Sequence, residues 1–205
     1  MAKKLIMIRH GALHDQYSGR FMGKTDVGLS SAGRSQAAAI SGLIRSINEA
    51  HIIVSPLCRA LETARIALES LNQSFDVVSD LHEIDFGAWE GKTFSEISAI
   101  DPPAVSGWSN FDQNFVFPDG EALQSFMQRM RRLARWITTD PAETVVAITH
   151  GGVIRFLICH FLGLEPRHYL LFGVDPASVS IIDLFGQTGV LTRLNDMCHL
   201  EKKDG

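Results

Sequence analysis

The sequence has few cysteines, no long apolar run and no excess of positive charge. Cys58, Cys159 and Cys198 are too few and too scattered for a disulfide framework, and they lack the C-x-x-C spacing of a zinc or redox site. No apolar stretch approaches the roughly 20 residues of a membrane span, and the strand-like start lacks a signal-peptide cleavage pattern. The formal net charge of -4 argues against a nucleic-acid or membrane surface. We therefore expect a reduced, cytoplasmic protein without nucleic-acid or membrane partners.

The chain does contain enough apolar sequence for a substantial core. Its 205 residues, 45% of them apolar, suit one domain over residues 1–205. Short apolar runs predict strands at residues 3–8, 51–54, 75–78, 144–149, 178–184 and 190–194. Apolar positions at helical spacing predict helices over about 31–47, 57–71, 123–137 and 153–162. This alternation predicts an α/β fold with three layers, in which a mostly parallel central sheet is flanked by helices.

Two helix starts and one irregular segment add detail. Ser30 or Ser31 is expected to cap the first helix, and Pro56 is expected to open the second. Residues 81–120 are aromatic-rich but irregular, so part of 81–140 is expected to form a small helical and loop subdomain over the carboxyl ends of the strands. That subdomain is either a substrate-contacting lid or a packing satellite without function. The arginines of the long helix that follows are expected to form a solvated face.

Three predicted strands end in residues that can bind an anion. The first ends in Arg9-His10-Gly11, the fourth in His150-Gly151-Gly152, and the second in Ser55-Pro56 with Arg59 one helical turn onward. Ligands of open α/β sheets bind at the carboxyl ends of the strands, and a helix N-terminus near Arg59 also favours an anion. A glycine directly after His10 permits close approach of a ligand to the backbone. Together these ends predict a phosphate or carboxylate cradle.

Such a cradle suits phosphoryl transfer. A neutral imidazole can act as the nucleophile and form a phosphohistidine, while two arginines and a second, protonated histidine hold the phosphoryl oxygens. A carboxylic acid that carries its proton near neutral pH must then protonate the departing alkoxide. Glu83 follows the third strand among apolar neighbours and is the preferred acid, with Asp85 and Glu90 as alternatives that spacing alone does not exclude.

These residues belong to an ordered set of motifs between about residues 5 and 155. In chain order the motifs are Arg9-His10-Gly11, Gly23-Lys24-Thr25-Asp26, Leu29, Gly33, Ser55-Pro56-Leu57-Cys58-Arg59-Ala60, Thr63-Ala64, Leu81-His82-Glu83, Phe86-Gly87-Ala88-Trp89-Glu90-Gly91, Pro118-Asp119-Gly120-Glu121 and Thr149-His150-Gly151-Gly152-Val153-Ile154-Arg155. The set resembles the histidine phosphatase superfamily, also called phosphoglycerate mutase-like.

The resemblance assigns roles to individual residues. It implies that His10 is the nucleophile, that Glu83 is the proton donor, and that Arg9, Arg59 and His150 bind the phosphate. It also implies that neither a metal nor an organic cofactor is needed. We add four candidates for substrate binding, which are Gly11, Gln16, Gly23 and Gly151.

Within the superfamily, the chain looks most like the alpha-ribazole phosphatase and broad phosphatase branch, because it lacks the longer insertion of phosphoglycerate mutases. Ala12 and Gln16 depart from the pattern, where many members have Glu and Asn. We expect a phosphomonoester hydrolase that acts on a small phosphorylated metabolite, with alpha-ribazole 5'-phosphate of cobalamin biosynthesis as one candidate. The alternatives are a phosphoglycerate mutase and, in a different class, an inactive module that binds a phosphorylated ligand or a protein. The oligomeric state stays open, a homodimer being one option.

Overall fold

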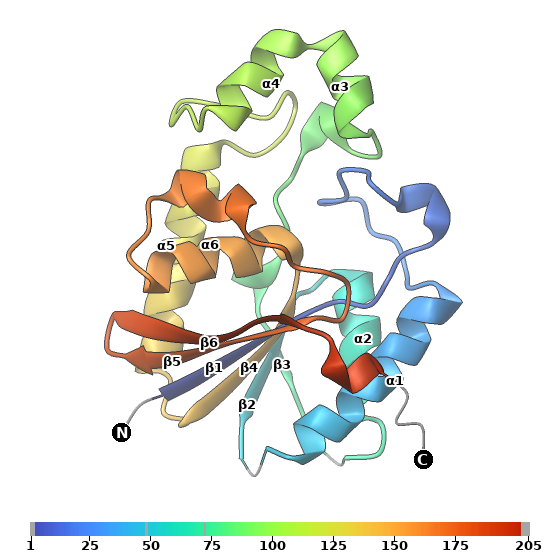
Figure 1. The fold of residues 1–205 in the computed structure, drawn as a ribbon, viewed down its shortest axis with the longest axis vertical. Coiled ribbons are helices and arrows are strands. Elements are labelled where there is room, and N and C mark those ends of the chain that lie inside the picture. The colour runs from blue at the N-terminus through green and yellow to red at the C-terminus, as the bar shows by residue number, and fades with distance from the viewer. Residues whose placement is uncertain (1–2, 48, 72, 202–205) are drawn as a thin grey trace.

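A mixed six-stranded sheet organises the chain, as the computed structural model of residues 3–47, 49–71 and 73–201 shows (Figure 1). The strand order is β3-β2-β4-β1-β5-β6. The first four strands pair in parallel, whereas β5 pairs antiparallel with β1 and β6 antiparallel with β5. The strands are β1 Lys3–Arg9, β2 His51–Val54, β3 Asp76–Val77, β4 Thr144–Thr149, β5 Val179–Phe185 and β6 Thr188–Asp196. The predicted, mostly parallel sheet is confirmed.

Helices cover both faces of the sheet. The helices on these faces are α1 Ser31–Arg45, α2 Cys58–Leu68, α5 Leu123–Thr139 and α6 Gly151–Phe161, whereas α3 Phe94–Ile100 and α4 Pro102–Ser109 lie beyond the sheet. Successive side chains of β1 point to opposite faces. Ile6 and Ile8 therefore pack in the core with α1 and α2, while Leu5 and Met7 belong to the core under α5 and α6. This arrangement confirms the three layers. None of the helices in the described ranges is long and apolar enough to cross a membrane.

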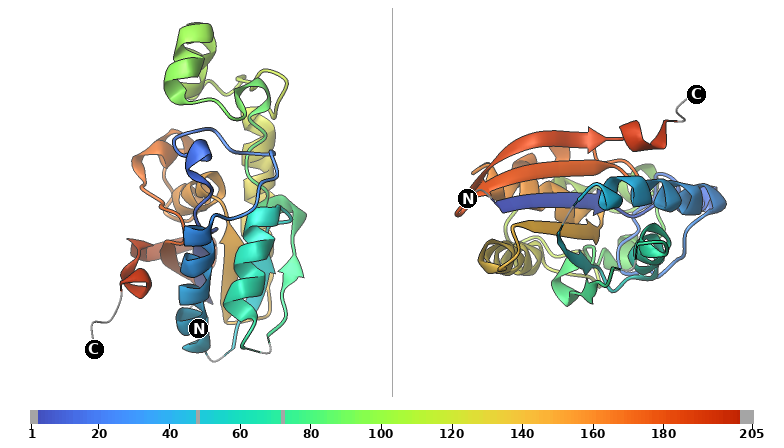
Figure 2. Two further views of the ribbon diagram at one scale, coloured as in Figure 1. Left: turned by 90° about the vertical axis from the view of Figure 1, so that its right-hand side faces the viewer. Right: turned by 90° about the horizontal axis from the view of Figure 1, so that it is seen from below.

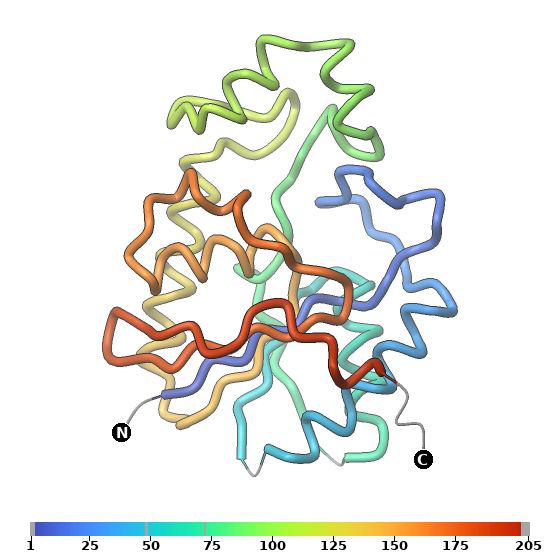
Figure 3. The backbone as a smooth tube through the Cα atoms, viewed as in Figure 1, coloured from blue at the N-terminus to red at the C-terminus, as the bar shows by residue number. Residues whose placement is uncertain are grey.

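A small subdomain with α3 and α4 stands beyond the carboxyl ends of the parallel strands. The chain leaves β3, rises into α3 and α4, and returns through the long helix α5 (Figures 2 and 3). Its interior is aromatic, since the rings of Trp89, Trp108 and Phe117 meet edge to face at centroid distances of 5.2 to 5.8 Å. These rings are buried and belong to the same cluster as the main core. Most of them therefore serve to pack the subdomain against it.

Of the two predicted helix starts, one is confirmed and the other is wrong. Ser30 does cap α1, accepting from the Gly33 amide at 3.0 Å, but α2 begins at Cys58 and not at Pro56. The Asp26 carboxylate accepts the Cys58 amide at 2.7 Å and satisfies a free donor of the first helical turn at that residue.

The prediction that all the arginines of the long helix face solvent is wrong for Arg129. The residue is only 4% exposed, and Glu121 accepts from its Nη2 at 2.9 Å. Its Nη1 donates to the carbonyls of Asp80 and His82, at 2.8 and 2.6 Å. Arg129 therefore holds in place the segment of residues 80–82, which leads directly into Glu83.

His51 at the start of β2 makes the stability of the fold depend on pH. Burial alone would lower its pKa, but hydrogen bonds to Asp140 at 2.6 Å and Asp76 at 3.0 Å raise the pKa above its usual value. A raised pKa in the folded state gives stability that is fully present below pH 6.5 and is lost as pH rises through the folded pKa. His51→Gln should therefore lower the free energy of unfolding at acidic pH by about 1 kcal/mol more than at alkaline pH.

Urea unfolding of the wild type and His51→Gln at about pH 5.5 and pH 8.5 measures this difference. His168→Gln is the control, because His168 has no ion pair in the part of the chain that the structure describes. A His51→Gln deficit that is equal at both pH values would contradict the charge-based account.

Candidate active site

His10 lies at the carboxyl end of β1 and is only 4% exposed. Its Nδ1 lies 2.8 Å from the Gly11 carbonyl oxygen, and a carbonyl can only accept, so Nδ1 carries the proton. The lone pair of the neutral ring is then on Nε2. Burial, followed by the charges of Arg9 and Arg59, holds the pKa of His10 well below its usual value. The ring is therefore neutral at physiological pH, which is the form that can act as a nucleophile.

Gly11 fixes the turn after β1 through packing. Its amide donates to Thr63 Oγ1 at 3.1 Å, and that hydroxyl donates in turn to the Arg59 carbonyl at 2.7 Å. A Cβ at Gly11 would lie 2.4 Å from the Gly33 carbonyl oxygen in α1. A glycine is thus required here because the turn approaches α1 closely. The sequence motif alone instead predicts that Gly11 lets a ligand approach the backbone.

His150 sits beside His10 at the end of β4, with ring centroids 5.1 Å apart. Its Nε2 lies 2.7 Å from Ser55 Oγ, and its Nδ1 accepts from Arg59 Nε at 3.2 Å. An Nδ1 that accepts carries no proton, and burial, Arg59 and His10 keep the pKa of His150 well below its usual value. Burial and the charges of two arginines therefore favour a neutral His150, and the protonated second histidine stays a prediction for the site with phosphate bound.

Arg59 is completely buried in the first turn of α2. Its Nη2 donates to the carbonyls of Met22 and Gly23, at 3.1 and 2.6 Å, and its Nη1 donates to that of Thr25 at 3.0 Å. The residue thus ties the loop of residues 22–25 to the wall of the site. Gly23, predicted to bind substrate, contributes its carbonyl to Arg59 and its amide to Glu90.

Arg9 contributes a guanidinium whose hydrogen-bond donors are only partly paired within the described residues. Its Nη1 donates to the Val174 carbonyl at 2.6 Å, while its buried Nε has no hydrogen-bond partner in the described ranges. The guanidinium lies over Gly151, since a Cβ built on that residue would be 3.7 Å from Arg9 Nε. A buried donor without an acceptor, next to the N-terminus of α6, is suited to an oxyanion.

The structure separates the three candidate acids. Glu83 is 7% exposed and faces the start of α6, where its Oε2 accepts the Gly152 amide at 2.9 Å. Glu90 accepts four backbone amides, from Gly23, Lys24, Thr25 and Phe86, and so holds the loop. Asp85 pairs with Lys24 at 3.4 Å and accepts the Gly87 amide. Glu83 alone is placed beside α6 and near the charges of Arg9 and Arg59.

Gly152, Ser55 and Thr63 complete the site, although the sequence motifs contained them without assigning them roles. A Cβ at Gly152 would lie 2.3 Å from Glu83 Oε1, so only glycine leaves room for the carboxylate. Gln16, in contrast, is exposed on the short turn of residues 15–17, and its carbonyl accepts from Arg20 Nε at 2.9 Å. Among the described residues, the Gln16 side chain makes no hydrogen bond to the other candidates.

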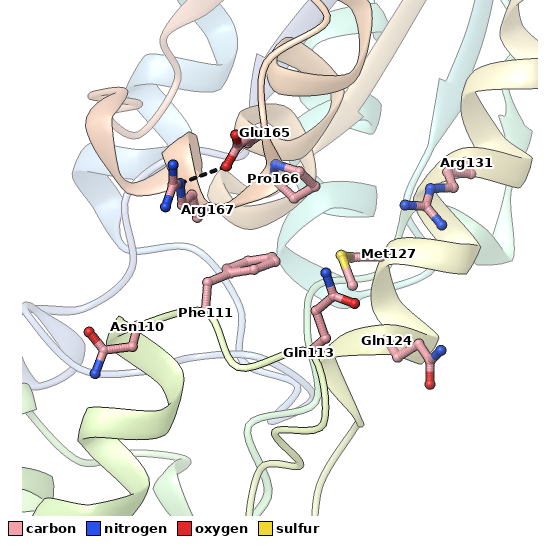
Figure 4. Close-up of a pocket in the computed structure, with 9 residues that line it drawn as sticks. All are labelled: Asn110, Phe111, Gln113, Gln124, Met127, Arg131, Glu165, Pro166 and Arg167. Carbon is pink, nitrogen blue, oxygen red and sulfur yellow. Dashed lines mark ion pairs between the residues drawn. The ribbon is translucent and has the colours of Figure 1, made fainter.

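A separate cavity of about 400 Å³ lies between the end of α4, the start of α5 and residues 165–167 (Figure 4). Arg131 lines it, as do Arg167 and Glu165, which pair at 2.7 Å. None of the five residues expected to perform the chemistry lines this cavity, so it is distinct from the histidine cluster. Within the described residues, no group of three His, Cys, Asp or Glu side chains could hold a metal ion.

The comparisons with known proteins agree with this geometry. A family model for the histidine phosphatase superfamily (branch 1) matches residues 5–197. The chain belongs to this superfamily. The adenosylcobalamin/alpha-ribazole phosphatase of Escherichia coli K12 is 28% identical over 94% of this histidine phosphatase and 95% of its own length. Phosphoserine phosphatase 1 of Hydrogenobacter thermophilus is 30% identical over 96% of this chain and 94% of its own length.

Solved structures show the same similarity. A putative alpha-ribazole-5'-P phosphatase from E. coli superposes with a TM-score of 0.85 at 28% identity, covering 96% of this histidine phosphatase and 97% of that chain. A mycobacterial glucosyl-3-phosphoglycerate phosphatase has a TM-score of 0.83 at 28% identity, and the match covers 96% of this histidine phosphatase and 100% of that chain. The predicted family and α/β fold are confirmed, and the protein is a phosphoric monoester hydrolase.

Proposed function

We propose that this histidine phosphatase hydrolyses small phosphorylated metabolites through a phosphohistidine on Nε2 of His10. The observation that carries the proposal is the protonation state of that ring. Nδ1 donates to the Gly11 carbonyl, and burial with two arginines keeps the ring neutral. A neutral ring with its lone pair on Nε2, surrounded by Arg9, Arg59 and His150, is suited to attack on phosphorus.

The first step transfers the phosphoryl group. Nε2 of His10 forms a bond to phosphorus while the bond from phosphorus to the ester oxygen breaks. Arg9, whose buried Nε has no hydrogen-bond partner among the described residues, and the amides at the start of α6 hold the phosphoryl oxygens. Glu83 gives its proton to the departing oxygen.

The second step returns the enzyme to its starting state. A water molecule attacks the phosphorus of the phosphohistidine and gives a proton to the Glu83 carboxylate. The bond between Nε2 and phosphorus breaks, and inorganic phosphate leaves. His10 and Glu83 are then neutral imidazole and carboxylic acid again, so protons and charges balance over the cycle.

This proposal does not specify the alcohol part of the substrate. The named relatives include an alpha-ribazole phosphatase at 28% identity and a phosphoserine phosphatase at 30%. Their substrates differ in size and charge, and these identities do not choose between them. Alpha-ribazole 5'-phosphate is therefore one member of the panel on which the enzyme should be assayed.

A turnover assay separates hydrolysis from the alternatives. We expect steady release of inorganic phosphate from an aryl phosphate, with no dependence on a bisphosphate primer. A mutase would instead isomerise phosphoglycerate and require such a primer. A binding module would bind phosphomonoesters without turning over any of them, and that result would overturn the proposal.

A further inference from the structure

The segment that carries Glu83 leaves the sheet before it reaches the site. The Val78 amide donates to the Val54 carbonyl at 2.9 Å, just after β3 ends. A short 3-10 helix, Ser79–Leu81, comes next, and Glu83 follows two residues later. A segment of this kind lies outside the hydrogen-bond ladder of the sheet, so the position of the acid depends on the side chains that hold the segment.

Three successive carbonyls of this segment accept hydrogen bonds from side chains. Arg129 on α5 binds two of them, those of Asp80 and His82, at 2.8 and 2.6 Å. The carbonyl between them, that of Leu81, accepts from Thr149 Oγ1 at 2.7 Å. Leu81 and Thr149 are both completely buried, so water cannot replace this bond. The segment is therefore held from two sides, by α5 and by the end of β4.

Thr149 also holds the nucleophile, through its main chain. It is the last residue of β4, pairs with Arg9 in the parallel ladder, and accepts the His10 amide with its carbonyl at 2.9 Å. Three residues farther along the same turn, the Gly152 amide donates to Glu83 Oε2 at 2.9 Å. The turn from β4 to α6 therefore connects nucleophile and acid, because the main chain of Thr149 binds His10 and its hydroxyl binds the segment of Glu83.

We propose that Thr149 is a positioning residue that sets the reach of the Glu83 carboxyl toward the departing oxygen. The inference rests on the proposed function, in which Glu83 protonates that oxygen. Proton transfer requires the acid within about 2.6 to 3.2 Å of its acceptor, and a misplacement of about 1 Å can cost about 100-fold in rate. Because His10 is held by the main chain of Thr149, a change of the Thr149 side chain displaces the acid and leaves the nucleophile in place.

Thr149→Val tests the hydroxyl, since it keeps the shape of the side chain. A methyl group stays at least about 3.3 Å from an oxygen, so the Leu81 carbonyl, which lies 2.7 Å from Oγ1, is pushed away. We expect kcat/KM for phenyl phosphate, whose departing oxygen is basic, to fall about 10-fold more than kcat/KM for p-nitrophenyl phosphate, whose oxygen leaves readily as an anion. Thr149→Ser retains the hydroxyl and should keep the wild-type ratio of the two values.

Thr144→Val is the matched control, because it makes the same change at the opposite end of β4 and should leave the ratio unchanged. Both substrates are assayed in one preparation, so unfolded protein lowers both values by the same factor. If Thr149→Val gives no folded protein, Thr149→Ala removes the same hydroxyl with less bulk and should lower the ratio in the same direction. In a double variant with Glu83→Gln, Thr149→Val should not lower the ratio further, because Thr149 acts through Glu83.

An equal loss for both substrates in Thr149→Val, or a ratio that Thr149→Ser does not keep, would assign Thr149 to the stability of the fold and overturn the inference. A further fall of the ratio in the double variant would do the same. If the wild type hydrolyses both aryl phosphates and Glu83→Gln leaves their ratio unchanged, the inference fails while the phosphatase activity stands. If the wild type hydrolyses no phosphomonoester, the proposed function itself fails, and the inference with it.

Discussion

His10→Ala is expected to lower kcat for every phosphomonoester by at least about 1,000-fold, because it removes the atom that accepts the phosphoryl group. His150 cannot replace it. The Nδ1 of His150 accepts from Arg59, and its Nε2 lies 2.7 Å from Ser55 Oγ, so both nitrogens are already engaged. Steady-state release of inorganic phosphate measures the effect.

Two further variants make this result interpretable. His10→Gln retains more of the side-chain volume and should be equally inactive, which separates loss of the nucleophile from a cavity. His160→Ala removes a half-buried histidine farther along α6 and should keep full activity. Residual activity of His10→Ala within tenfold of the wild type would mean that His10 is not the nucleophile.

Glu83→Gln should show a loss that depends on the leaving group. A general acid contributes about 100- to 10,000-fold when the departing oxygen is basic, and much less when it leaves readily as an anion. We therefore expect a large fall in kcat for an alkyl phosphate and a small one for p-nitrophenyl phosphate. The two values are measured in the same preparation, so a folding defect affects both alike.

Glu90→Gln is the control for this carboxylate. Glu90 binds the amides of residues 23–25, so its loss should weaken the fold and reduce both activities by one factor. If Glu83→Gln instead reduces both substrates equally, another carboxylate is the proton donor. Asp85 would be the next residue to substitute, since it lies two residues farther along the same segment.

Much of the fold was predictable because its physical signals are local. The apolar runs before Arg9, Ser55 and His150 mark three parallel strands, and the carboxyl ends of such strands meet at one edge. That rule alone brought together two histidines that are 140 residues apart in the sequence. Glu83 is the preferred acid because of its apolar neighbours, and the resemblance to the family then favours it over Asp85 and Glu90.

The remaining features depend on tertiary contacts that spacing does not contain. Arg129 resembles its neighbours in sequence but is buried by Glu121 and by two carbonyls from the segment before Glu83. The neutral state of His150 follows from its burial and then from the placement of Arg59, which is far from it in the chain. Gly152 has its role because the Glu83 carboxylate occupies the space of a Cβ.

The covalent intermediate is the central claim, and rapid quenching during turnover tests it most directly. The enzyme is mixed with an aryl phosphate, stopped in alkali, digested and analysed by mass spectrometry. We predict a phosphoryl group on the peptide that contains His10, stable in base, lost in acid and absent from His10→Ala. Steady hydrolysis by the wild type with no phosphorylated His10 at any time would contradict the account and indicate direct attack by water.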